Sequence, residues 1–272
     1  MKMNDEVAIR NASTVVLARN SPDGPEVFML ERNVKSEFVA GAYVFPGGAV
    51  DRHDGHEDLS AICAGLDDNA ANQRTCMVSG GLGFWVAAIR ECFEESGVLI
   101  ACRNDVPIDF SDTQVADRFS VYRESLNRRE MSFSEICREE SLVLPVDKLT
   151  LFSRWLTPLG MPRRFDTCFF ICPLPDGQAP LHDGHETVNG LWCTPEQALS
   201  KGEAGEIKLV AATTKILETL RGHRSVADLI VAVTPTGAVS TICPTLIHDN
   251  NGKPTRVSIP MPDGEVEHEL SN

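Results

Sequence analysis

The chain has 272 residues, of which 42% are apolar and 24% are charged, and its formal net charge is −14. This length allows one large domain or two small ones, and the composition is ordinary for a globular protein with a buried core. Nucleic-acid binding needs a basic patch, so the acidic balance argues against a nucleic-acid partner.

Targeting and membrane-spanning segments are not expected. Residues 1–6 lack the apolar core of a signal peptide. The uncharged run at 75–89 is shorter than the roughly 20 residues that span a bilayer. Nine cysteines occur without a Cys-x-x-Cys pair, which favours reduced, mostly buried thiols. The sequence therefore predicts a cytoplasmic protein with no membrane partner.

The first third of the chain predicts a hairpin, a glycine turn and two helices. β-branched runs at 13–19 and 26–32 are joined by a turn-forming connection. A strand at 41–48 is expected to run into a tight glycine turn. One helix is expected at 58–66, and another begins near residue 84 and ends at 97, where a glycine is typical of a helix C-cap.

Strands and helices continue to alternate in the rest of the chain. Strands are predicted at 98–102, 164–172 and 187–193, and helices at 112–130, 132–140 and 207–221. A further helix begins after Thr194, the expected N-cap, with Pro195 at its first position. The tail alternates Val and Ile with Pro and Gly, which indicates one or two peripheral strands. The interleaving favours one α/β domain.

Three acidic residues lie on one face of the helix that ends at residue 97. Glu91, Glu94 and Glu95 have the spacing i, i+3, i+4. Carboxylates this close repel one another unless a cation lies among them. A hard divalent ion such as Mg²⁺ or Mn²⁺ prefers oxygen ligands and is the natural candidate. The alternative is a solvated acidic helix face.

The segment Arg90–Val98 reads Arg-Glu-x-x-Glu-Glu-x-Gly-Val, and Pro46-Gly47-Gly48 precedes it. This pattern closely resembles the signature of the Nudix hydrolases. The resemblance implies an α/β/α sandwich, here a single domain over 1–272. That domain would carry insertions at 49–89 and 112–142 and a C-terminal extension at 225–272.

The signature departs from the family pattern at two places. Cys92 stands at an aliphatic position, and residues 49–89 form a far longer spacer than the family has. The first-half glutamate position falls on Asp54 when counted from Gly48 and on Leu82 when counted from Arg90. Both assignments stay open.

The Nudix resemblance implies metal-dependent hydrolysis of a nucleoside diphosphate derivative, a small-molecule nucleotide substrate. Glu91, Glu94 and Glu95 would hold Mg²⁺ or Mn²⁺, and Arg90 would support a catalytic glutamate. The general base would be Glu94 or Glu186. Gly47 and Gly48 would bring main-chain groups near the metal or the phosphate.

Several stretches resemble the branch of coenzyme A and acyl-CoA diphosphatases. They are Leu30–Arg32, Val44–Gly48, Trp155–Pro158, Arg163–Thr167 and Trp192. Arg32, Arg163 and Arg164 are candidates for phosphate contacts. Phe165 and Trp155 could stack on a base, but core packing is the favoured role of each.

The branch's coenzyme A motif is not complete here. Asn33 and Glu37 occupy positions where it has a small residue and an arginine. An ADP-ribose or NADH diphosphatase, or a nucleotide sensor without activity, are the alternatives. A homodimer is left open.

One pentapeptide occurs twice, at His53–Glu57 and at His182–Glu186. It is either a coincidence of two ordinary turns or a sign that both loops border one metal site. The glycines at 80–83 raise a second question, because they could form the hinge of a lid or simply belong to a packed insertion.

Overall fold

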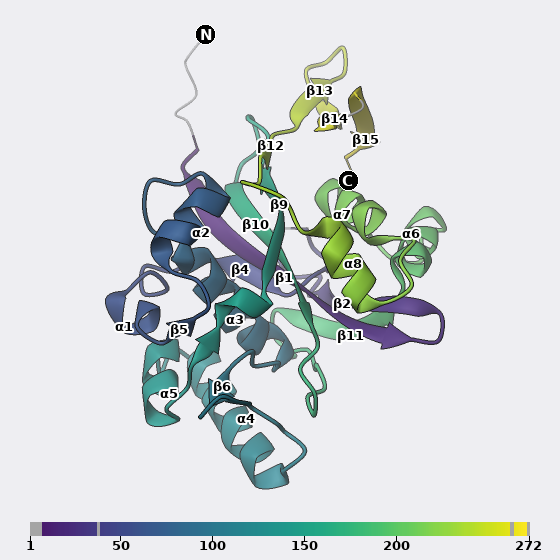
Figure 1. Ribbon diagram of the computed structural model, residues 1–272. Coiled ribbons are helices and arrows are strands. Elements are labelled where there is room, and N and C mark those ends of the chain that lie inside the picture. Colours follow the sequence, from purple (N-terminus) through teal and green to yellow (C-terminus); the bar gives the residue numbers. More distant parts are fainter. Residues whose placement is uncertain (1–6, 37–38, 262–263, 271–272) are drawn as a thin grey trace.

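The computed structural model describes residues 7–36, 39–261 and 264–270. A central sheet has the strand order β11-β2-β1-β10-β9-β12 (Figure 1). The bounds are β1 Ile9–Ser21, β2 Gly24–Arg32, β9 Thr150–Leu156, β10 Arg164–Pro173, β11 Thr187–Cys193 and β12 Thr241–Ile242. β1 and β2 form the predicted antiparallel hairpin, and β1 runs parallel to β10.

The predicted strand at 41–48 is wrong, because the chain forms two short strands there. β3 Tyr43–Val44 pairs with β2, and β4 Gly47–Ala49 pairs with β1. The break falls at Pro46, which has no N–H for a ladder and whose carbonyl accepts from Val15. By changing partner strand, the chain brings Gly47 and Gly48 against β1.

Helices cover both faces of the sheet. Alternate side chains of β1 and β2 pack against α1 to α5 on one face and against α6 to α8 on the other. The bounds are α1 Glu57–Ser60, α2 Asp68–Thr75, α3 Leu82–Ser96, α4 Thr113–Asn127, α5 Phe133–Glu139, α6 Pro195–Glu203, α7 Ala211–Leu220 and α8 Val226–Val233. This is the three-layer α/β/α arrangement expected from the sequence.

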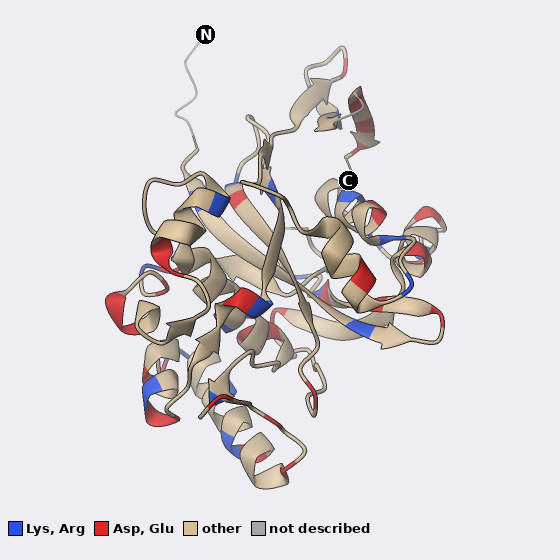
Figure 2. Ribbon diagram, viewed as in Figure 1, with Lys and Arg blue, Asp and Glu red and all other residues tan. Residues whose placement is uncertain are grey.

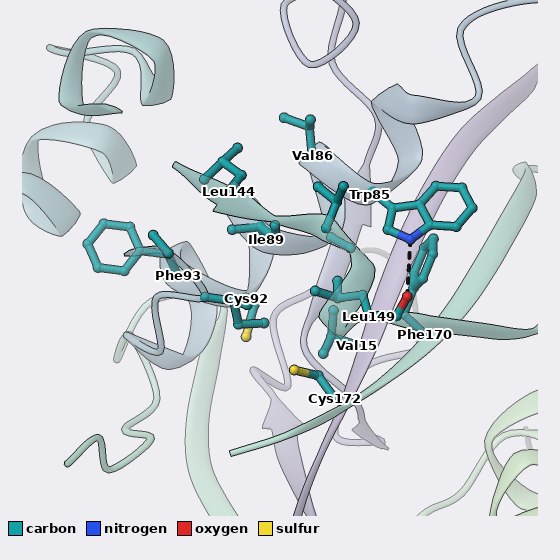
Figure 3. Close-up of a cluster of buried hydrophobic side chains, with 14 of the residues drawn as sticks. Val15, Trp85, Val86, Ile89, Cys92, Phe93, Leu144, Leu149, Phe170 and Cys172 are labelled. Atoms are coloured by element: carbon teal, nitrogen blue, oxygen red, sulfur yellow. Dashed lines mark hydrogen bonds between the residues drawn. The ribbon is translucent and has the colours of Figure 1, made fainter. Parts of the chain in front are cut away.

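The acidic residues stand on a helix, α3, that is otherwise embedded in the core. Trp85 packs edge-on against Phe170 with ring centroids 4.8 Å apart and donates Nε1–H to the carbonyl of Leu149 (Figure 3). Gly97 closes α3 with φ 71°, as predicted. Deep burial of one side of α3 fixes the opposite side, which carries the acids.

The first insertion differs from its prediction. The helix expected at 58–66 is only the short α1, and β5 Cys63–Ala64 follows and pairs with β8 Leu144–Pro145. α2 was not predicted. Leu59 and Leu66 pack into the core around α3. This packing, and not the helical periodicity of the sequence, decides the local structure.

The glycines between α2 and α3 are held in place. Gly81 donates its N–H to Oδ1 of Asn72 at 2.7 Å, and Leu82 donates to Oδ1 of Asp68 at 3.0 Å. A Cβ at Gly81 would lie 2.7 Å from the Asn72 side chain. The contacts are those of a packed insertion whose α2 side chains cap α3, and they give the lid interpretation no support.

The strand predicted at 98–102 is wrong, since the paired segment there is only the short β6 Cys102–Arg103. It pairs with β7 Val106–Pro107, and Cys102 also bridges to Val143. The two helices predicted after it are present as α4 and α5. Asp112 caps α4, and Ser132 caps α5 in a capping box. The 3₁₀ turn Val146–Lys148 then leads into β9.

The C-terminal third also departs from its prediction. α7 begins at Ala211 and not at 207, because Ala42 bridges to Lys208 and keeps that segment extended. α8 was not predicted. Beyond β12, a separate sheet contains β13 Thr245–His248, β14 Pro254–Met261 and β15 Gly264–Glu269.

Two expectations about chemistry can be compared with the fold. All nine cysteines lie within the described residues and are free thiols, and Cys92, Cys137, Cys168, Cys172 and Cys193 are buried. Within the described ranges, no helix is long and apolar enough to cross a membrane. In Figure 2, Lys and Arg positions are interspersed with Asp and Glu positions along the ribbon.

Candidate functional site

A cavity of about 1950 Å³ collects most of the residues that the sequence marks as functional. Alternate residues of β1 and β10, among them Thr14 and Phe165, contribute to its lining, as do the acidic face of α3 and the loop at 181–186. The turn between α4 and α5 lines it as well. Segments far apart in the sequence thus meet at one hollow.

The three glutamates of α3 line this cavity while being largely removed from solvent. Glu95 is 5% exposed, and the side chains of Glu91 and Glu94 are 13% and 23% exposed. Burial raises the pKa of Glu91 to about 7, and the nearby charge of Glu94 adds to the rise. Burial and the charge of Glu91 raise the pKa of Glu95 well above its usual value. The raised pKa values indicate that the positive charge nearby is too small to balance three ionised carboxylates.

Arg90 is the cation already present in the cluster. Its Nη1–H groups donate to Oε1 of Glu91 at 2.9 Å and to Oε1 of Glu94 at 3.0 Å. Its Nε and Nη2 form a fork on Asp54 at 2.8 and 2.9 Å. Burial favours the neutral form of Arg90, but Asp54, Glu91 and Glu94 together raise its pKa above the ordinary value. Arg90 therefore stays charged and fixes the glutamates.

Asp54 is the residue that the sequence left undecided. It is 1% exposed and faces Arg90 from the loop after β4. Leu82, the alternative position, is buried in the hydrophobic core at the start of α3. Asp54 thus occupies the acidic first-half position in space, and it holds the arginine of the motif.

The two glycines of the turn are required by close approach to α3. Gly47 donates its N–H to Oε2 of Glu95 at 2.9 Å. A Cβ at Gly48 would lie 2.6 Å from the carboxylate of Glu91. The backbone of β4 therefore forms one wall of a narrow, oxygen-lined cradle that a side chain would fill.

This cradle fits a hard divalent cation. Its ligand atoms are carboxylate oxygens, which Mg²⁺ and Mn²⁺ prefer, and its buried carboxylates carry raised pKa values that a cation would lower. Within the part of the chain that the structure describes, no three His, Cys, Asp or Glu side chains already converge as assembled ligands. Arg90 lies between Glu91 and Glu94 in this arrangement.

The Gly48→Ala variant is expected to weaken Mn²⁺ binding at least about 10-fold. The added methyl group would displace the carboxylate of Glu91, one of the proposed ligands. The measurement is the rise in unfolding temperature on adding Mn²⁺. Gly237→Ala is the matched control, since a Cβ there meets no described atom within 4 Å. An unchanged Mn²⁺ effect in Gly48→Ala would contradict the cradle.

The loop before β11 brings Glu186 to the same cavity. Asp183 shapes the loop by accepting from the backbone N–H groups of His185, Glu186 and Thr187. Burial and the charge of Glu91 are the main causes of the raised pKa of Glu95, and the charge of Glu186 adds to the rise. Glu186 therefore lies within electrostatic reach of the acidic cluster.

Both copies of the repeated pentapeptide border the cavity. Their aspartates have different roles: Asp54 binds Arg90, whereas Asp183 stabilises its own turn. Both loops thus border one cavity, and the histidines do not assemble a metal site in the described residues.

The predicted arginines separate into two groups. Arg32 and Arg163 line the cavity, and Nε of Arg32 is buried with no hydrogen-bond partner among the described residues. Arg164 is absent from the described lining, because residues alternate along β10, and it donates Nε to the carbonyl of Thr157. The structure therefore places Arg164 outside the group of arginines that face the cavity, and its phosphate contact stays a prediction. Phe165 lines the cavity, as does Trp155, which is buried in the core as expected.

The segment that would carry a coenzyme A motif is described in part. Asn33 binds the loop of Glu186, donating Nδ2–H to the carbonyl of His185 and its N–H to that of Glu186. Glu37 and Phe38 lie outside the described residues. Asn33 thus connects the end of β2 to the loop.

Comparisons with known proteins identify the family to which the chain is similar. The NUDT19 Nudix domain matches residues 65–218. The acyl-coenzyme A diphosphatase NUDT19 of Xenopus laevis is 30% identical over 223 residues, which are 70% of this chain and 58% of that protein. The human protein of that name is 27% identical over 76% of this chain and 63% of its own length. The chain thus spans less than two thirds of these relatives.

A solved structure shares the fold. It is a NUDIX hydrolase from Alicyclobacillus acidocaldarius, with a TM-score of 0.63 and 23% identity, and the match covers 84% of this chain and 98% of that one. The fold predicted from the sequence is confirmed.

Proposed function

This chain belongs to the Nudix family through its NUDT19 Nudix domain, and from that premise we propose that it hydrolyses the diphosphate of a nucleoside diphosphate derivative. The observation that carries the proposal is the buried cluster of Glu91, Glu94 and Glu95 on the cavity wall. Water attack on a diphosphate develops charge on the attacking and leaving oxygens. An acidic cluster poised for a cation suits that reaction.

Glu91, Glu94 and Glu95 are the proposed ligands of Mg²⁺ or Mn²⁺, which would offset negative charge on the phosphates and lower the pKa of a bound water. Arg90, held by Asp54, keeps Glu91 and Glu94 in place. Gly47 orients Glu95 through its N–H.

The remaining roles fall to residues across the cavity. Glu94 and Glu186 are the two candidates to take the proton from the attacking water at a carboxylate oxygen. Arg32 and Arg163 face the cavity and would bind the substrate's phosphates. The buried Nε of Arg32 has no hydrogen-bond partner among the described residues, which supports a role in binding a phosphate.

Coenzyme A or an acyl-CoA is the proposed substrate, with 3′,5′-ADP and phosphopantetheine or its acyl form as products. Two relatives named acyl-coenzyme A diphosphatase support this choice, as do the sequence stretches shared with that branch. The cavity is larger than most small-molecule sites, which suits a long substrate. Asn33 and Glu37 depart from the branch, so ADP-ribose and NADH stay in the test.

The proposal is tested by incubating the full chain and Mg²⁺ or Mn²⁺ with coenzyme A, acyl-CoAs, ADP-ribose, NADH and dinucleoside polyphosphates. We expect 3′,5′-ADP to form from coenzyme A or its esters and EDTA to stop turnover, because the acidic cluster needs a cation. Faster cleavage of ADP-ribose or NADH would overturn coenzyme A as the proposed substrate, whereas the proposed diphosphate hydrolysis would stand. No turnover of any compound would leave the sensor function.

Three further expectations stay predictions. They are the cytoplasmic location, a homodimer, and a single domain over 1–272 with additions at 49–89, 112–142 and 225–272. Fractionation of cells would test the first of these. Light scattering would test the second, and limited proteolysis the third.

A further inference from the structure

The helical insertion at 112–142 meets the candidate site through α4. Arg123, on α4, donates Nε–H to the carbonyl of Glu94 at 2.9 Å and Nη2–H to the carbonyl of Leu181 at 2.9 Å. Glu94 belongs to the last turn of α3, and Leu181 begins the loop that ends at Glu186. One guanidinium thus joins the two segments that carry the candidate bases.

The C-terminal carbonyls of α3 would otherwise lack partners, because the last turn of a helix has no following N–H groups for them. A cation is favoured there by the helix dipole. Asn127 of α4 also faces the carbonyl of Glu94, at 3.4 Å, and Leu181 donates its N–H to the carbonyl of Ser96 at 2.8 Å. The end of α3 is therefore completed by α4 and by the loop.

The glycine that ends α3 is matched to this arrangement. Gly97 has φ 71°, and a Cβ there would lie 3.0 Å from Nη1 of Arg123. At the far end of the loop, Asn33 donates its N–H to the carbonyl of Glu186 at 2.9 Å. Arg123 and Asn33 thus hold the loop at both ends.

We propose that Arg123 is a positioning residue for the hydrolysis, setting the Glu186 loop in place against the last turn of α3. This inference rests on the proposed function. Arg123 acts through two main-chain carbonyls, so its loss displaces Glu186 relative to Glu94 and leaves the carboxylates themselves intact. The 112–142 insertion thereby becomes part of the catalytic framework.

The test compares Arg123→Gln and Arg123→Lys with a control on the same helix, Arg118→Gln. Arg118 lies outside the described lining and pairs with Glu140 at 2.9 Å, within the insertion. We expect Arg123→Gln to lower kcat about 10- to 100-fold with KM within about 3-fold, as a misplaced group does. Lysine carries its donors on a single nitrogen, whereas Arg123 reaches the two carbonyls from Nε and Nη2, so Arg123→Lys should recover only part of the rate. Arg118→Gln should stay within about 2-fold of wild type.

A double-mutant cycle with Glu186→Gln separates positioning from general destabilisation. If Arg123 acts by placing the loop, the loss from Arg123→Gln shrinks in the Glu186→Gln background. Additive losses would overturn the proposal. So would a KM increase with unchanged kcat, because that result would make Arg123 a direct substrate contact, which its place in the cavity lining allows.

Hydrogen exchange keeps the inference testable if no compound is turned over. Arg123→Gln should speed amide exchange in residues 181–187 and at the end of α3, whereas Arg118→Gln should not. Unchanged exchange in 181–187 would overturn the positioning role. Failure of the proposed function would instead appear as an inactive wild-type chain with the expected exchange difference still present.

Discussion

The Glu94→Gln variant is expected to lose turnover by about 10²- to 10³-fold, the scale of removing one preorganised electrostatic group from an active site. The change removes a charge from the acidic cluster and one of the two candidate bases. Its fold should persist, because Arg90 keeps its contacts to Asp54 and Glu91. The measurement is kcat with saturating Mn²⁺ and whichever of the compounds tested under the proposed function the chain cleaves fastest.

A matched control for this variant is Glu218→Gln. Glu218 pairs with Lys215 on α7 and lies outside the described lining of the cavity. It should retain activity within about 2-fold, because neither Glu218 nor its buried partner Lys215 belongs to the described lining of the cavity. Full turnover by Glu94→Gln would remove Glu94 from both of its proposed roles.

The Asp54→Asn variant is expected to show the largest loss of stability among the substitutions at the site. It breaks a buried, forked ion pair with Arg90, and removing one partner of such a pair costs about 3 kcal/mol in free energy of unfolding. That cost corresponds to a fall of about 6 to 12 °C in unfolding temperature. Turnover should fall as well, because Arg90 would no longer be held beside Glu91 and Glu94.

The control for Asp54 lies in the same insertion. Asp58 is exposed, and its carboxylate meets His56 at 3.5 Å and Arg138 at 3.8 Å on the surface, so Asp58→Asn should leave the unfolding temperature within about 1 °C. Calorimetry of both variants without added metal separates the ion pair from any effect of a cation. Equal unfolding temperatures in the two variants would show that the buried pair does not stabilise the fold.

Short-range patterns in the sequence determined much of the site. The spacing of Glu91, Glu94 and Glu95 placed three carboxylates on one helix face, and that face lines the cavity. The glycine pair upstream was expected to bring main-chain groups near a metal or a phosphate, and the structure shows Gly48 lying close to Glu91. The hairpin β1–β2 and the capped helices α4 to α6 also follow from local chemistry, because turns and caps involve residues close in the chain.

Only the tertiary structure decided which distant residues complete these patterns. Because of the long spacer, the sequence could not decide whether Asp54 or Leu82 stands at the first-half glutamate position of the signature. The contact between Asp54 and Arg90 selects Asp54. The register of β10 turns Arg164 away from the cavity while Phe165 lines it. Arg123 reaches Glu94 and Leu181 across the fold. Such pairings depend on how insertions pack against α3, and no local periodicity encodes contacts between residues so far apart in the chain.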